Sequence, residues 1–143
     1  MGCSTSRDIG INPLPFNEVY KLENTILGKG GFGLVSLGKR LSDDTVVAVK
    51  IVYPSGERTR AAEKALLQEW AIMRGLDHPG VIRAFDLFVE KRLYSMAVEY
   101  IAGGDLFERV IAKDNYTELD ARDLTKNLLL ALKYLHDQDI VHR

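Results

Sequence analysis

Cysteine is nearly absent from this chain of 143 residues, which contains a single one, Cys3. One thiol can form neither an intramolecular disulfide nor a multi-thiolate metal site, and this usage is typical of a reducing compartment. No sign of charge predominates, because 19 basic and 20 acidic residues leave a formal net charge of -1. Nucleic acid is therefore not expected as a partner. The longest uninterrupted apolar run, Leu128–Leu132, is far shorter than the ~18 residues of a membrane-spanning helix.

The composition is nevertheless sufficient for a folded core. Apolar residues make up 46% of the chain and charged residues 27%, which are ordinary values for a globular protein. The length corresponds to one domain on a scale of about 150 residues per domain. A disordered, collagen-like or coiled-coil chain is not indicated.

The N-terminus carries a short lipidation pattern. Met1–Ser6 fits M-G-x-x-x-[ST], in which Gly2 becomes a myristoylation site and the adjacent Cys3 a candidate for thioacylation. A chance match is the alternative. Because one myristoyl chain binds a membrane only marginally, lasting attachment would also require Cys3. We therefore expect a cytoplasmic protein that lies on the cytoplasmic face of a membrane.

Hydrophobic periodicity predicts a small sheet followed by helices. Residues 1–19 form an N-terminal extension, and its proline-containing part from Ile9 to Asn17 is predicted to be extended. The predicted strands are Tyr20–Leu27, Leu34–Lys39, Thr45–Val52, Val81–Val89 and Leu93–Tyr100, and the predicted helices are about Thr59–Leu76, Asp105–Ala112 and Glu118–Gln138. The fold class is therefore α+β, with an antiparallel sheet and one helix preceding an all-helical segment.

A glycine-rich run, Gly28–Val35, lies between the first two predicted strands and reads G-x-G-x-x-G-x-V. A Rossmann fold would need a helix after the glycines, and a Walker loop would need a terminal G-K-[ST]; neither is present. The interpretation that remains is a glycine-rich hairpin whose backbone N–H groups point at phosphates. An ordinary glycine-rich β-turn is the alternative.

Two charged residues occupy positions where packing predicts apolar side chains. Lys50 shares a strand face with Val46, Ala48 and Val52, and a buried ammonium requires an anion. Glu69 lies in the helix stripe of Ala65, Leu66, Ile72 and Met73. Each has a simpler explanation, because lysine side chains reach toward solvent and a stripe can have a polar edge. Together they predict an ion pair between helix and sheet.

These motifs, in this order, resemble the amino-terminal part of a eukaryotic-type protein kinase domain. The glycine loop, the segment Val47–Lys50 as the V-A-I-K motif and Glu69 as the helix glutamate carry the resemblance. Further matches are the turn Leu76–Pro79, the hinge-like Val98–Tyr100, the lobe-opening Gly103–Phe107 and the C-terminal Ile140–Arg143. The turn and the G-G-D-L-F segment are most similar to calcium- and calmodulin-dependent-type Ser/Thr kinases. The resemblance implies a small lobe at 20–98, a hinge at 99–104 and the start of the large lobe at 105–143.

The resemblance also implies residue roles and a cofactor, Mg-ATP. Lys50 and Glu69 would be the catalytic-site pair that orients the phosphates. Val98 would be the gatekeeper, Glu99 and Ile101 would bond the adenine edge through their backbones, and Asp105 would accept from the ribose hydroxyls. The complete implied nucleotide-binding set is Leu27, Gly28, Lys29, Gly30, Gly31, Phe32, Gly33, Val35, Ala48, Lys50, Val98, Glu99, Ile101 and Asp105. Core packing alone is the alternative for the apolar members.

The sequence departs from the kinase pattern at its C-terminus. It ends at Arg143, so the catalytic-loop Asp and the D-F-G segment, which include the family's metal ligands, are not among its residues. The resemblance implies a Ser/Thr kinase that phosphorylates protein hydroxyls, and we expect this stretch to be an incomplete, inactive domain. The alternatives are a nucleotide-binding pseudokinase and a lipid-anchored interaction module that binds through its leucine-rich helix.

Overall fold

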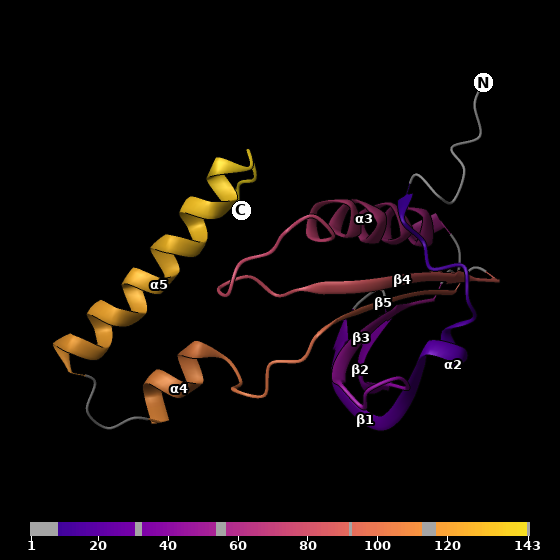
Figure 1. Ribbon diagram of the computed structural model, residues 1–143, viewed down its shortest axis with the longest axis horizontal. Coiled ribbons are helices and arrows are strands. Elements are labelled where there is room, and N and C mark those ends of the chain that lie inside the picture. Colours follow the sequence, from indigo (N-terminus) through magenta and orange to yellow (C-terminus); the bar gives the residue numbers. More distant parts are fainter. Residues whose placement is uncertain (1–8, 31–32, 54–56, 92, 113–116, 143) are drawn as a thin grey trace. The chain divides into compact units, whose positions relative to one another are not determined.

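The computed structural model describes residues 9–30, 33–53, 57–91, 93–112 and 117–142. The chain divides into two units, each compact in itself (Figure 1). The sheet unit comprises Met1–Leu76 and Arg83–Tyr100, and the helical unit comprises Asp77–Ile82 and Ile101–Arg143. The division differs from the predicted lobes at two places, one of which is the predicted hinge 99–104, split after Tyr100. The segment Asp77–Ile82 belongs with the helices rather than with residues 20–98.

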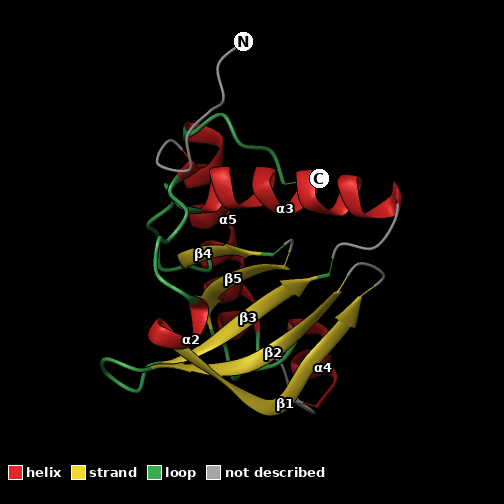
Figure 2. Cartoon of the chain, turned by 90° about the vertical axis from the view of Figure 1, so that its right-hand side faces the viewer, coloured by secondary structure: helices red, strands yellow, loops and turns green. Residues whose placement is uncertain are grey.

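The sheet unit contains five antiparallel strands, as predicted. These are β1 (Tyr20–Gly30), β2 (Gly33–Arg40), β3 (Val46–Val52), β4 (Ala84–Glu90) and β5 (Leu93–Glu99). Their order across the sheet is β1-β2-β3-β5-β4 (Figure 2). The most β-branched segment therefore forms the central strand, where both faces can be covered.

Both faces of the sheet carry a buried apolar cluster. Helix α3 (Glu57–Met73) covers one face, and its Ala62, Leu66 and Trp70 pack with residues of β4 and β5 such as Leu87 and Met96. On the other face Tyr20, Val47, Val49, Ile51, Phe88 and Ala97 form the second cluster. The neighbouring β3 residues Ile51 and Val52 contribute to opposite clusters, as the two-residue repeat of a strand requires.

The buried stripe of α3 differs from the predicted one. Ala65 and Ile72 were expected to face the sheet, and both are exposed. The buried positions are Ala62, Leu66 and Trp70, which recur at the four-residue spacing of one helix face. The predicted stripe was therefore rotated about the helix axis, because Ala65 and Ile72 are apolar and share helical spacing with Glu69, although neither lies on the buried face.

The predicted extended lead-in also differs from what is found. Ile11 forms an isolated parallel bridge with Leu87, and Phe16–Val19 forms a short helix, α2. Phe16 then stacks on Tyr20 with ring centroids 5.7 Å apart and meets Phe88 edge-on at 5.2 Å. This part of the N-terminal extension is therefore built into the sheet unit.

Tyr20 anchors this junction through a buried hydroxyl. The hydroxyl donates to Asp86 Oδ2 at 2.6 Å, while Asp86 Oδ1 accepts from Asn12 Nδ2 at 2.9 Å. Burial, and then the hydrogen bond to Asp86, raises the pKa of Tyr20 from 10.0 to about 12. The phenol is thus held in its neutral form.

The helical unit consists of α4 (Leu106–Ala112), α5 (Glu118–Asp137) and the segment Asp77–Ile82. The Asp77 N–H donates to the Tyr134 hydroxyl at 2.8 Å, and the His78 ring stacks on Tyr134 with centroids 4.9 Å apart. These contacts attach the segment to α5. No helix in the described ranges is long and apolar enough to cross a membrane.

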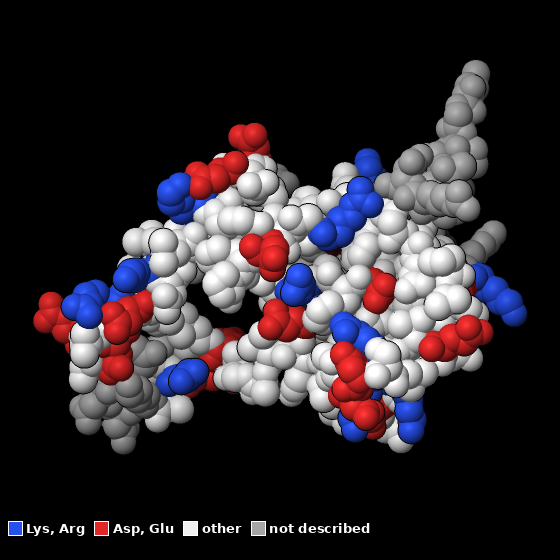
Figure 3. Space-filling view, in the orientation of Figure 1, with Lys and Arg blue, Asp and Glu red and all other residues white. Residues whose placement is uncertain are grey.

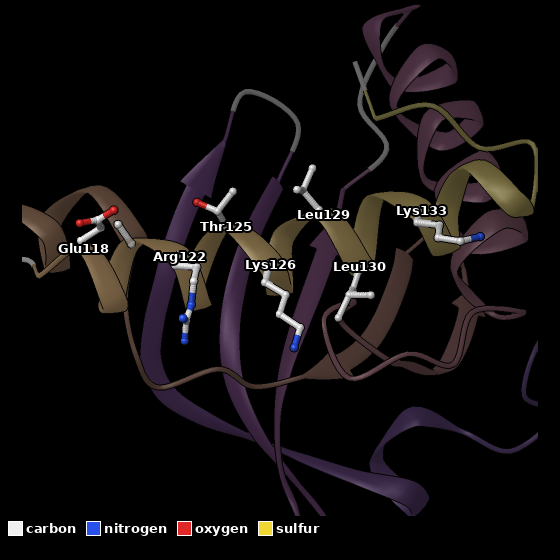
Figure 4. Close-up of a pocket in the computed structure, with 8 residues that line it drawn as sticks. Glu118, Arg122, Thr125, Lys126, Leu129, Leu130 and Lys133 are labelled. Atoms are coloured by element: carbon white, nitrogen blue, oxygen red, sulfur yellow. The ribbon is translucent and has the colours of Figure 1, made fainter.

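Helix α5 exposes much of its apolar surface. Leu128, Leu129 and Leu130 are all about half exposed, and a shallow hollow of about 630 Å³ runs along the helix. Figure 4 shows the side chains that line it, with Leu129 and Leu130 between the basic residues Lys126 and Lys133. The hollow involves α5 alone and none of the predicted site residues.

Acidic and basic side chains are interspersed over the visible face of the protein (Figure 3). Exposed ion pairs such as Lys39–Glu23, at 3.8 Å, join neighbouring strands of the sheet unit. The nearly neutral net charge is thus distributed as a mixture of both signs.

Candidate functional site

The predicted ion pair between helix and sheet is present. Lys50 lies in β3 on the sheet face that α3 covers, and its Nζ donates a hydrogen bond to Glu69 Oε2. Because Lys50 comes from the central strand and Glu69 from the helix, the bond ties two elements at one point. The pair fixes the direction of a flexible point cation.

The pair is more exposed than its sequence environment predicts. The side chains of Lys50 and Glu69 retain 38% and 39% of their accessible surface, whereas strand packing predicted a buried ammonium. Lysine's long stem allows the ammonium to reach the rim of the apolar face. Because exposed pairs contribute only about 0–1 kcal/mol to stability, the value of this pair lies in orientation and in access for a ligand.

An apolar surface continues from Lys50 across three strands. Ala48 is paired with Val98 of β5, and Lys50 is paired with Val35 of β2, so these side chains share one face. Val35 and Val98 are half-buried and Ala48 is buried. Leu27, the remaining member of the predicted apolar slot, is exposed and lies at a register shift of β1. The face offers flat apolar contact beside a cation.

The glycine run forms the hairpin of β1 and β2. Register pairs join Gly28 with Val35, Lys29 with Leu34 and Gly30 with Gly33, on either side of residues 31–32. Gly31 and Phe32 lie outside the described residues. A Cβ built on Gly28 meets nothing within 4 Å, so the backbone there is open to approach.

Two features hold this hairpin in place. The buried Ser36 hydroxyl lies 3.1 Å from both the Glu23 and the Thr25 carbonyls, where β1 departs from regular pairing. A Cβ on Gly33 would lie 1.9 Å from the Ile51 carbonyl oxygen. Only glycine therefore fits where β2 approaches β3 so closely.

The family profile of the protein kinase domain matches residues 21–143. The chain belongs to the protein kinase family. The match covers both units and places Lys50, Glu69 and the glycine hairpin in one kinase domain. The five-stranded sheet with a single covering helix agrees with a kinase small lobe, and α4 and α5 agree with the first helices of the large lobe.

Curated relatives of this kinase domain are Ser/Thr protein kinases. Calcium/calmodulin-dependent protein kinase type 1 of Macrobrachium nipponense is 33% identical over 141 residues, which is 98% of this chain and 40% of that protein. Myosin light chain kinase A of Dictyostelium discoideum is 35% identical over 126 residues, 88% of this chain and 42% of that protein. MAP kinase-interacting serine/threonine-protein kinase mnk-1 of Caenorhabditis elegans is 35% identical over 129 residues, 90% of this chain and 18% of that protein. The chain thus spans less than half the length of these relatives.

The residues that the sequence predicts as a hinge are divided between the two units. Glu99 ends β5, and its backbone N–H donates to the Arg83 carbonyl at 2.8 Å. Ile101 is exposed in the helical unit, where Asp105 Oδ1 also accepts the Phe107 N–H at 2.7 Å. Asp105 therefore stabilises the first turn of α4, whatever its role toward a ligand.

The residues that secure α3 on the sheet are not among those predicted from the sequence. Trp70 Nε1–H donates to the Ile9 carbonyl at 2.7 Å, and the Tyr94 hydroxyl donates to Glu63 Oε1. The spacing of Ala62, Leu66 and Trp70 was the available signal for the buried face. Nothing in the sequence indicates that a single carbonyl of the N-terminal extension is the partner of Trp70.

Proposed function

We propose that this chain binds ATP on the sheet face that carries Lys50, as part of a kinase domain that transfers phosphoryl groups to protein serine or threonine hydroxyls. The observation that carries the proposal is the Lys50–Glu69 bond, which joins β3 to α3 beside the apolar surface of Val35, Ala48 and Val98. An ammonium next to a flat apolar face suits a ligand with an aromatic ring and an anionic tail. Bound ATP, with Mg²⁺, would supply the phosphoryl group.

The chain's own residues divide the binding work. Lys50 holds phosphate oxygens, and Glu69 keeps its ammonium directed at them. Val35, Ala48 and Val98 exclude water from the adenine ring, and the glycine hairpin, whose backbone is open to approach at Gly28, presents N–H groups to the phosphates. By resemblance, the backbones of Glu99 and Ile101 contact the adenine edge and Asp105 contacts the ribose. Because the Glu99 N–H is already bonded to Arg83, Glu99 would contribute its carbonyl.

Nucleotide titration tests this site. We expect the parent chain to bind a fluorescent ATP analogue with Mg²⁺, and Lys50→Met to weaken that binding about tenfold or more, because a charge-assisted contact to phosphate is lost. Lys39→Met is the matched control, since it removes a lysine that is paired with Glu23 on the exposed surface. Equal affinities for the parent and Lys50→Met chains would overturn the proposed site.

Phosphoryl transfer requires groups that the 143 residues do not contain. The proton-accepting Asp of the kinase catalytic loop and the D-F-G segment are not in the sequence. We therefore expect the purified chain to incorporate no more labelled phosphate into Ser/Thr substrates than Lys50→Met does. Lys50-dependent incorporation would contradict this expectation.

We also propose that the N-terminus is acylated at Gly2 and Cys3 and holds the protein on a cytoplasmic membrane surface. The support is the sequence pattern alone, because residues 1–8 lie outside the described residues. Gly2→Ala should be fully soluble on cell fractionation, whereas Cys3→Ser should exchange between membrane and cytosol, since one acyl chain binds reversibly. A wholly soluble parent without acyl mass on its N-terminal peptide would refute the proposal.

A further inference from the structure

Residues Ile9–Asn12, here named the N-terminal strap, lie against two elements of the sheet unit. Beside the Ile11–Leu87 bridge, the Asn12 N–H donates to the Leu87 carbonyl at 2.8 Å. Asn12 Nδ2 also bonds the Asp86 carboxylate. These bonds fix the strap to the outer edge of β4, which is the last strand of the sheet.

The strap also contacts α3 through Trp70. The indole is 4% exposed, packs with Leu66 and Leu87, and donates its N–H to the Ile9 carbonyl at 2.7 Å. The side chains of Ile9 and Ile11 pack against the same cluster. The strap therefore links the edge of the sheet to α3 through the side chain of Trp70.

Trp70 directly follows Glu69 in the helix. Because a helix moves nearly as a rigid body, anchoring the indole restrains the rotation and the axial position of the backbone from which the Glu69 carboxylate extends. The Lys50–Glu69 bond cannot set that position by itself, since both side chains are more than a third exposed and such a pair is weak. The buried contacts of Trp70 are the stronger constraint.

We propose that the N-terminal strap positions Glu69 for its bond with Lys50, acting through Trp70. The proposal rests on the proposed function, because the pair is taken to orient the nucleotide. The docked strap and the Lys50–Glu69 bond then require the same position of α3 on the sheet, so loss of the strap should weaken the bond. Trp70 and Ile9 are positioning residues, and neither contacts the ligand.

Gly10 provides a specific way to loosen the strap. Its φ is +69°, a backbone conformation that residues with a side chain rarely adopt, whereas Arg74 Nη1, 2.9 Å from an added Cβ, is the end of a flexible side chain and can move aside. Gly10→Ala therefore strains the strap at its contact with α3. Gly75→Ala is the matched control, because a Cβ there meets only the Ile72 carbonyl oxygen at 4.0 Å.

Carbodiimide cross-linking reports on the pair without any nucleotide. The reagent joins a carboxylate and an amine only when they touch, so the Lys50–Glu69 cross-link should fall severalfold in Gly10→Ala and stay at the parent level in Gly75→Ala. The cross-link of Lys133 with Asp137, 2.6 Å apart on α5, is the internal reference in every sample. Emission of Trp70, the one tryptophan in the chain, should shift to the red in Gly10→Ala as the strap leaves.

A double-mutant comparison separates positioning from general stabilisation. Gly10→Ala should weaken Mg-ATP binding about fivefold in the parent background, but by less than about twofold once Glu69→Gln has removed the carboxylate. Trp70→Phe, which keeps an aromatic ring and removes the donor, should reproduce the loss if Gly10→Ala folds poorly by far-ultraviolet circular dichroism.

The outcomes distinguish this proposal from the proposed function. An unchanged Lys50–Glu69 cross-link in a Gly10→Ala chain with red-shifted Trp70 emission would overturn the positioning role. Equal losses of affinity in both backgrounds would do the same. A parent chain without Lys50-dependent ATP binding would refute the proposed function, while a cross-link that depends on Gly10 would still support the strap.

Discussion

The sheet unit and the helical unit bury their apolar residues to very different extents. The sheet unit has two clusters that cover both faces of β3. Among the described residues of the helical unit, Ala131 is the one buried apolar side chain, while the neighbouring leucines of α5 are exposed. Apolar content alone thus does not produce a core, and α5 depends on cover that the described residues do not supply.

The largest difference in stability between the two units should appear when a leucine is truncated in each of them. Leu66 is 1% exposed in α3, and Leu129 is 59% exposed in α5. We expect Leu66→Ala to lower the free energy of unfolding by about 2–5 kcal/mol and Leu129→Ala to change it by less than about 0.5 kcal/mol. Urea denaturation followed by Trp70 fluorescence and by circular dichroism measures both. Comparable losses would mean that α5 is covered as well as α3.

Alkaline pH should weaken the sheet unit through Tyr20. Its folded pKa of about 12 exceeds the ordinary 10.0, so the folded chain holds the phenolic proton more tightly. The contribution is complete below pH 10 and is progressively lost as the pH rises toward 12. Denaturation midpoints between pH 9 and 12 should fall more steeply for the parent than for Tyr20→Phe. Parallel profiles would show that Tyr20 titrates normally.

Local capping should matter more in the helical unit, where packing contributes little. The Thr117 hydroxyl accepts the Asp120 N–H at 3.1 Å, and Asp120 Oδ2 accepts the Thr117 N–H at 3.1 Å, which completes a capping box at the start of α5. Thr117→Ala should cost about 1 kcal/mol and increase hydrogen exchange in the first turn. Thr125→Ala, in the exposed middle of α5, is the control. Equal effects at the two threonines would argue against the cap.

The smallest effect is expected for a surface ion pair. Lys133 Nζ lies 2.6 Å from Asp137 Oδ2, one turn apart on α5. Lys133→Ala should change stability by at most about 0.5 kcal/mol, and the difference should vanish in 1 M salt because the charges are screened. A larger loss that persists in salt would indicate that the Lys133 stem packs against apolar surface.

Strand alternation and helical spacing in the sequence predicted most of the strands and the helix of the sheet unit. Alternation along β3 placed Lys50 on the face of Ala48, and helical spacing placed Glu69 toward the sheet although it misplaced Ala65 and Ile72, so the ion pair was predictable from sequence. The docking of Ile9 and Trp70 was not, because a single bridge and a single carbonyl leave no repeat in the sequence. The exposure of Lys50 was also missed, because a strand pattern gives the face of a residue but not the reach of its side chain.

The bridge at Ile11 also affects how the protein behaves toward copies of itself. β4 is an edge strand of the sheet, and an edge strand offers unpaired backbone N–H and C=O groups to any extended peptide. The Ile11–Leu87 bridge and the hydrogen bond from the Asn12 N–H to the Leu87 carbonyl pair part of that edge with the chain's own backbone. The N-terminal strap, which holds α3, therefore also covers part of an edge strand. Release of the strap would expose that edge to intermolecular β-pairing and aggregation.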